Sequence, residues 1–63
     1  MFSVGDFIVE RESARAPASF GVVKAFEMAL GDQLLDVQFP TERLYTFASH
    51  CQPYEKWLDE HGF

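Results

Sequence analysis

The chain has 63 residues, of which 48% are hydrophobic and 16% aromatic, and it carries five Lys or Arg against ten Asp or Glu. A chain this short forms a single domain, here residues 1–63, and has little room for a deep catalytic cleft. Its seven Phe, two Tyr and one Trp are too much apolar mass for a disordered tail. We therefore expect a small folded domain that is not an enzyme.

The net charge of −5 argues against a protein that binds nucleic acid by neutralising phosphates, because that task needs clustered Lys and Arg. Residues 32–63 contain six acids and two bases, so the negative field belongs mainly to the second half of the chain. We expect no direct nucleic-acid binding, and a basic partner surface is favoured over an acidic one.

Cysteine usage and hydropathy predict the compartment. Cys51 is the only cysteine and cannot form an internal disulfide, whereas small secreted domains usually carry two or more bridges. No basic region followed by an apolar run comes after Met1, so we expect no export signal. The longest apolar runs have two or three residues, far below the roughly 18 needed to cross a bilayer. A cytoplasmic protein without membrane contact is expected.

The first half of the chain predicts two strands. Residues 4–11 contain the run Phe7-Ile8-Val9, which favours a strand, and residues 13–19 have the pattern of a loop. Residues 20–28 fit either a helix that ends at a glycine or a strand. Gly21 and the two valines that follow it weaken a helix, so a strand is favoured.

The second half predicts two further strands and a helix. Residues 34–40 alternate apolar and polar side chains and form a hairpin with the preceding strand across the turn at 30–33. Residues 43–48 are rich in β-favouring side chains. Residues 53–61 start at a proline and stop before a glycine, which predicts a short helix.

Aromatic side chains supply most of the expected core. The helix carries Tyr54, Trp57 and Leu58 at i, i+3 and i+4, and this stripe is expected to lie on the sheet. The aromatic residues expected in the core are Phe7, Phe26, Phe39 and Trp57.

Four to five short strands, a long first loop and a C-terminal helix predict a mainly β fold of the small SH3-like or Tudor-like barrel type, in which a bent sheet encloses the core. Residues 4–9, 20–26 and 35–45 together resemble the N-terminal Tudor-like domain of the bacterial RNA-polymerase-associated Swi2/Snf2 ATPase. The likeness covers residues 2–47, and its most specific part is the Phe-Pro…Arg-Leu-Tyr stretch that ends at Tyr45.

The resemblance implies a non-catalytic arm that contacts RNA polymerase or regulates an attached ATPase. The chain contains no phosphate-binding Gly-x-x-x-x-Gly-Lys-Ser/Thr loop. An excised domain and a free-standing relative of the family are both consistent with that composition.

Catalytic and metal sites are not expected. Ser49, His50 and Cys51 are consecutive, and neighbours on an extended chain point to opposite faces, so they do not form a nucleophile and base pair. His50, Cys51 and His61 lack the paired short spacings of structural zinc sites. Cys51 is interpreted as a small buried or half-buried side chain, and no cofactor is expected.

The candidate partner-binding residues are Arg43, Tyr45, Phe47 and Tyr54. Arg and Tyr are over-represented at interface hot spots, which favours a protein-contact patch. An aromatic cage for a methylated lysine is a less favoured interpretation of the same rings, because it needs three or four of them to converge.

Two functional hypotheses follow. The first is a protein-interaction module that contacts the transcription machinery or a helicase or ATPase. The second is a free-standing acidic inhibitor, of the kind that phages encode, which occupies a basic nucleic-acid channel. Its surface would comprise Asp32, Asp36, Glu42, Asp59 and Glu60. The oligomeric state stays open, including a dimer paired through exposed strand edges.

Overall fold

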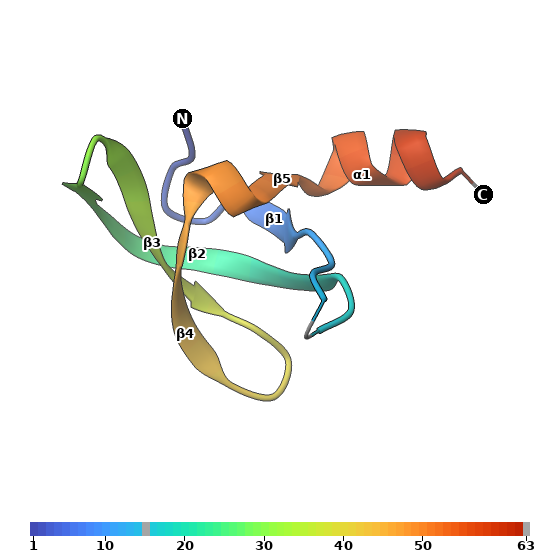
Figure 1. Ribbon diagram of the computed structural model, residues 1–63, viewed down its shortest axis with the longest axis horizontal. Helices are drawn as coiled ribbons and strands as arrows, with labels where there is room; N and C mark the ends of the chain where they lie inside the picture. The colour runs from blue at the N-terminus through green and yellow to red at the C-terminus, as the bar shows by residue number, and fades with distance from the viewer. Residues whose placement is uncertain (15, 63) are drawn as a thin grey trace.

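The computed structural model describes residues 1–14 and 16–62. Its elements are β1 (Phe7–Glu10), β2 (Ser19–Ala29), β3 (Asp32–Gln38), β4 (Arg43–Phe47), a 3₁₀ turn η1 (Ala48–His50), β5 (Cys51–Pro53) and α1 (Tyr54–His61). The strands form one open antiparallel sheet in the order β4-β3-β2-β1-β5 (Figure 1). The fold is therefore mainly β with one short C-terminal helix.

The predicted segments coincide with observed elements, and the preference for a strand at 20–28 is confirmed. Their ends shift by a few residues: β1 is shorter than 4–11, and β3 starts before 34. β5 was not predicted, because three residues are too few to show a period of two. β5 pairs with β1 and so brings the C-terminal part of the chain beside its first strand, at one edge of the open sheet.

β2 bends where it passes from one neighbour to the other. Its first part pairs with β1, its later part pairs with β3, and a register shift at Lys24 marks a bulge. A side chain at Gly21 has no room, since a Cβ atom there would come within 2.5 Å of Val37 Cγ1 and 2.8 Å of the Gln38 carbonyl oxygen. Glycine at position 21 thus allows β3 to pack closely against the bent strand.

The core lies on one face of the sheet and is mostly aliphatic. It comprises Ile8, Val23, Leu35, Val37, Phe39 and Cys51. Val9 is also buried, but it alternates with Ile8 and therefore points to the opposite face. There it lines a small cavity of about 40 Å³ together with Tyr54 and Trp57, so β1 is covered on both faces.

The expected aromatic core is largely wrong. Of the four predicted residues only Phe39 is buried, while Phe7 is 65% exposed, Phe26 is 43% exposed and Trp57 is half-buried. Phe7 neighbours Ile8 and points away from the core. Phe26 pairs with Leu35 on the core side, but it lies in the part of β2 that β1 does not cover.

The helix also departs from expectation. α1 follows β5 directly and projects beyond the end of the sheet (Figure 1), and none of its residues is fully buried. Tyr54, Trp57 and Leu58 are half-buried. Tyr54 contacts Phe20 with ring centroids 6.1 Å apart. The apolar stripe therefore docks on the end of the sheet through its first turn instead of lying across a face.

The β2–β3 hairpin has a two-residue turn, Leu30-Gly31, with positive φ at both residues (55° and 75°). Positive φ at both central positions is the requirement of a type I′ turn, which matches the twist of the strands. Gly31 adopts this conformation without cost, but Leu30 does not. The side chain of Leu30 is 95% exposed and does not compensate for the strain through packing.

We predict that Leu30→Asn raises the free energy of unfolding by about 1 kcal/mol, because Asn adopts the left-handed region at lower cost than Leu. Urea denaturation of the two proteins measures the change. Leu30→Ala is the control: it removes the exposed side chain but keeps the strain, so its stability should match that of the original chain. Equal stability of the Asn and Ala variants would contradict the assignment of strain at this turn.

Candidate protein-interaction surface

The side chains of β4 alternate between the two faces of the sheet. Leu44 and Thr46 share the core face, and Arg43, Tyr45 and Phe47 lie on the opposite face, here called the outer face. Tyr45 is 70% exposed and Phe47 is half-buried. Three of the four predicted partner-binding residues thus stand in a row on one strand.

Arg43 is held in place by a carboxylate on the next strand. Its Nε and Nη2 atoms donate to Oδ1 and Oδ2 of Asp36 at 2.8 and 2.9 Å. Asp36 stands directly opposite Tyr45 on the same face. The hydrogen bond from Arg43 lowers the pKa of Asp36, and the same pair raises the pKa of Arg43. This two-point contact fixes the plane of the guanidinium beside the tyrosine ring.

A shallow groove of about 140 Å³ runs along this face, and Leu34, Asp36 and Tyr45 contribute to its lining. Its full lining is apolar, aromatic and acidic, and Arg43 stands next to it, paired with Asp36; the lining residues are Ala25, Phe26, Glu27, Leu34, Asp36 and Tyr45. Such a mixture is typical of a protein-contact surface. We call Leu34, Asp36, Arg43 and Tyr45 the β4 patch.

Tyr54, the fourth predicted residue, does not join the β4 patch. It directly follows β5, at the opposite edge of the sheet from β4, and its ring contacts Phe20 of β2. Its ring also stacks near Trp57 at a centroid distance of 6.4 Å, and Trp57 in turn stacks on His61 at 4.4 Å. These rings form a second cluster on the helix, so the aromatic residues do not converge on one cage.

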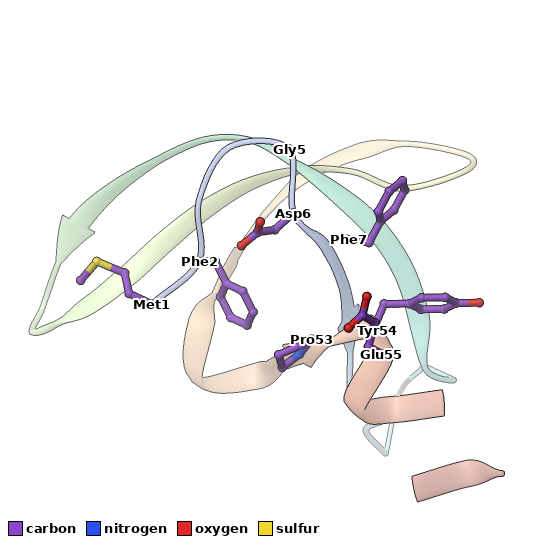
Figure 2. Close-up of a pocket in the computed structure, with 8 residues that line it drawn as sticks. All are labelled: Met1, Phe2, Gly5, Asp6, Phe7, Pro53, Tyr54 and Glu55. Carbon is purple, nitrogen blue, oxygen red and sulfur yellow. The ribbon is translucent and has the colours of Figure 1, made fainter. Parts of the chain in front are cut away.

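A pocket of about 590 Å³ opens where the N-terminal segment meets the start of α1 (Figure 2). Met1 and Phe2 lie on one side of it, and Phe7, Tyr54 and Glu55 on the other. Sequence reasoning missed this pocket, because the two segments that form it are about as far apart in the sequence as the chain allows. No motif connects them.

The N-terminal side of the pocket is braced by hydrogen bonds. Asp6 Oδ2 accepts the backbone N–H of Ser3 at 2.9 Å, and the Asp6 carbonyl accepts the N–H of Val23 at 3.0 Å. Phe2 is held by its backbone, which exchanges hydrogen bonds with the buried side chain of Gln33 at 2.8 and 2.6 Å. The pocket is thus built by a turn that is tied to the sheet.

The five acidic residues of the inhibitor hypothesis do not gather on one surface. Asp36 and Asp32 belong to β3, Glu42 to the β3–β4 turn, and Asp59 and Glu60 to α1. The β2–β3 hairpin and α1 lie at opposite ends of the long axis (Figure 1). Asp36 is paired with Arg43, so its charge is already offset.

Asp32 is engaged within the protein as well. Its carboxylate accepts the Ser49 hydroxyl at 2.6 Å and the backbone N–H of Gln33 at 2.7 Å. The hydrogen bond from Ser49 is the largest cause of its lowered pKa. Asp32 therefore anchors η1 to the start of β3.

The consecutive residues Ser49, His50 and Cys51 engage different partners. Ser49 donates to Asp32, His50 packs edge-on against Phe47 at 6.4 Å, and Cys51 Sγ donates to the Phe47 carbonyl at 3.5 Å. Cys51 is buried, as expected. Over residues 1–14 and 16–62, no three or more His, Cys, Asp or Glu side chains come together as a metal site.

Comparisons of this chain with protein-family models, curated proteins and solved structures found no match. None of the helical segments in the described part of the chain has the length and apolar character of a membrane span.

The pairing of Asp36 with Arg43 predicts a measurable titration. We expect the pKa of Asp36 to lie below 3.8 and to return toward that value in Arg43→Gln. Because the folded pKa is the lower one, ionised Asp36 stabilises the fold above the unfolded pKa, and this contribution is lost as the pH falls through the folded value. NMR titration of the side-chain carboxyl carbon measures it. Lys56→Gln, the same charge change on α1, should leave the pKa of Asp36 unchanged.

Cys51 is predicted to be unreactive. Burial raises the pKa of its thiol from 9.0 to about 11. That shift alone lowers the thiolate fraction at pH 8 about 100-fold, and the thiolate is the reacting species. We expect the native chain to react with a disulfide reagent at least ~100-fold more slowly than the urea-unfolded chain. A native rate within tenfold of the unfolded rate would show that Cys51 is accessible.

Proposed function

We propose that the chain is a non-catalytic protein-interaction module that binds its partner through the β4 patch. The observation that carries the proposal is the exposed ring of Tyr45 beside the clamped guanidinium of Arg43. The fold does not need this ring, because the aliphatic core forms without it. Asp36 already holds the guanidinium of Arg43, so less entropy is lost when a partner covers it, and Tyr and Arg side chains are common binding anchors.

The same proposal places the chain among small SH3-like or Tudor-like barrels. Three features support it: β2 is bent at a bulge, β5 returns to pair with β1, and the buried residues cluster on one face of the curved sheet. The resemblance over residues 2–47 points the same way. Under this proposal the partner belongs to the bacterial transcription machinery or is a helicase or ATPase, and the setting is cytoplasmic.

The acidic-inhibitor hypothesis has less support from the geometry. An inhibitor that mimics nucleic acid needs a continuous row of carboxylates. Here Asp36 is paired, Asp32 is hydrogen-bonded to Ser49, and the helix acids lie at the other end of the molecule. The dependence of binding on salt separates the two hypotheses, since an attraction that is mainly Coulombic is screened as salt increases.

The test is affinity capture by the immobilised chain from a lysate of bacteria at low and at moderate salt, with mass spectrometry of the retained proteins. We expect RNA polymerase, a helicase or an ATPase to be retained at both salt concentrations. Tyr45→Ala should reduce that recovery at least about tenfold, as truncation of a hot spot does. Phe7→Ala is the matched control, since it removes an aromatic ring that is 65% exposed outside the β4 patch.

Each other outcome counts against the proposal. Recovery that collapses at moderate salt and competes with DNA would favour the acidic inhibitor. Equal losses in Tyr45→Ala and Phe7→Ala would remove the β4 patch from the interface, and capture of chaperones alone would count against both hypotheses.

A further inference from the structure

The sheet ends in two edges of very different character. β5 has three residues, finishes at Pro53 and continues directly into α1, so it offers little backbone to another strand. β4 has five residues and contains neither proline nor glycine, and its pairing with β3 shows no bulge. Proteins usually protect an edge strand with a short length, a proline, a bulge or a charged side chain. The only such device on β4 is Arg43, and its charge is offset by Asp36.

The turn before β4 shows which residues of β4 form backbone hydrogen bonds with β3. The N–H of Phe39 donates to the carbonyl of Glu42 at 2.8 Å, which makes this a hydrogen-bonded pair. Hydrogen-bonded and non-hydrogen-bonded pairs alternate along an antiparallel ladder. The next hydrogen-bonded pair is therefore Val37 with Leu44, and Thr46 forms the one after it.

The remaining residues of β4 direct their backbone groups away from β3. These are Arg43, Tyr45 and Phe47. The Phe47 carbonyl accepts the thiol of Cys51, but no other described segment pairs with the backbone of Arg43 or Tyr45. The free edge thus presents two complete sets of N–H and C=O groups at Arg43 and Tyr45 and one further N–H at Phe47.

We propose that this edge pairs with β4 of a second copy of the chain, antiparallel and with the two-fold axis at Tyr45. The pairing unites two five-stranded sheets into one continuous sheet. It goes beyond the proposed function, because a second copy pairs with the backbone edge of β4, whereas a different protein would bind the groove on the outer face; the two contacts share the side chains of Arg43 and Tyr45.

The side chains favour a second copy as the occupant. In this register Tyr45 lies beside its own symmetry mate, and Arg43 of each copy stands opposite Phe47 of the other. Aromatic pairs and cation–aromatic pairs are both favourable across strands. Arg43 is the only charged residue of β4, and its charge is offset by Asp36. Pairing two copies therefore brings no uncompensated like charges together, and the edge does not select a charged peptide.

The side chains on the core face of β4 also fit this pairing. Leu44 of one copy lies opposite Thr46 of the other, in the non-hydrogen-bonded position where side chains approach most closely. Leu44 is 47% exposed in the single chain, and the second strand would cover it. The interface has five residues on each side, far fewer than the roughly 20–30 of a standard stable interface. The dimer is therefore a weak one that forms as the concentration rises.

The test is sedimentation equilibrium of the purified chain from 10 µM to about 1 mM. We expect a monomer–dimer equilibrium within this range. Tyr45→Lys places two ammonium groups side by side at the two-fold axis, so it should weaken the dimer at least about tenfold. Phe7→Lys introduces the same charge at another exposed aromatic position and should change the dissociation constant less than about twofold. Circular dichroism confirms that both variants keep the sheet.

NMR of a mixture of labelled and unlabelled chains tests the register. We expect an intermolecular contact between the α-protons of Leu44 and Thr46, which face outward from β3. A chain that stays monomeric at the highest concentration would overturn the proposal. So would a dimer that Tyr45→Lys and Phe7→Lys affect equally, or one whose intermolecular contacts lie outside β4.

Discussion

The approach of β3 to the backbone of β2 at Gly21 is the constraint on which the rest of the structure depends. β2 is the strand that passes from one half of the sheet to the other, and it bends at the Lys24 bulge. At Gly21 the side chain of Val37 occupies the space that any Cβ would take. This contact brings Ile8, Val23 and Leu35 into one aliphatic cluster, and the cluster fixes which face of every strand is buried.

The composition of the core determines which large side chains are left on the surface. Because small aliphatic side chains fill the interior, most of the large rings are left to the solvent or to the end of the sheet. Phe7, Phe20 and Tyr45 are more than half exposed. A small domain that exposes rings at this density has surfaces suited to contact with other chains, which links the packing of the interior to the proposed binding role.

The sequence was sufficient for the local elements and insufficient for their burial. Period-two alternation and turn residues located β3 and β4 within a few residues, and the flanking Pro53 and Gly62 located the helix. Phe7 was assigned to the core for its large apolar ring, whereas the structure buries Ile8 on the core face and Val9 under the helix side chains on the other face, and Phe7 stays exposed. β5 was not predicted, because it has only three residues and its partner, β1, lies about 40 residues away in the sequence.

The candidate site, too, was predictable from the sequence only in part. A single strand carries Arg43, Tyr45 and Phe47, and their spacing by two residues was enough to place them on a shared face. The contact of Asp36 with Arg43 depends on the register between β3 and β4, which the sequence did not predict. The separation of Tyr54 from these residues depends on the order of the strands, which the sequence did not predict either. The terminal pocket needed the return of β5 to β1, which no local pattern encodes.

The position of Trp57 has a consequence for how unfolding is observed. It is the only tryptophan, and it stands on α1, where it lines a small cavity with Val9 and Phe20 and stacks on His61. Indole emission in this protein therefore reports the attachment of the terminal helix, while far-ultraviolet dichroism reports the strands. If the helix detaches before the sheet melts, the two optical signals will follow separate transitions, and the emission midpoint alone will understate the resilience of the rest of the molecule.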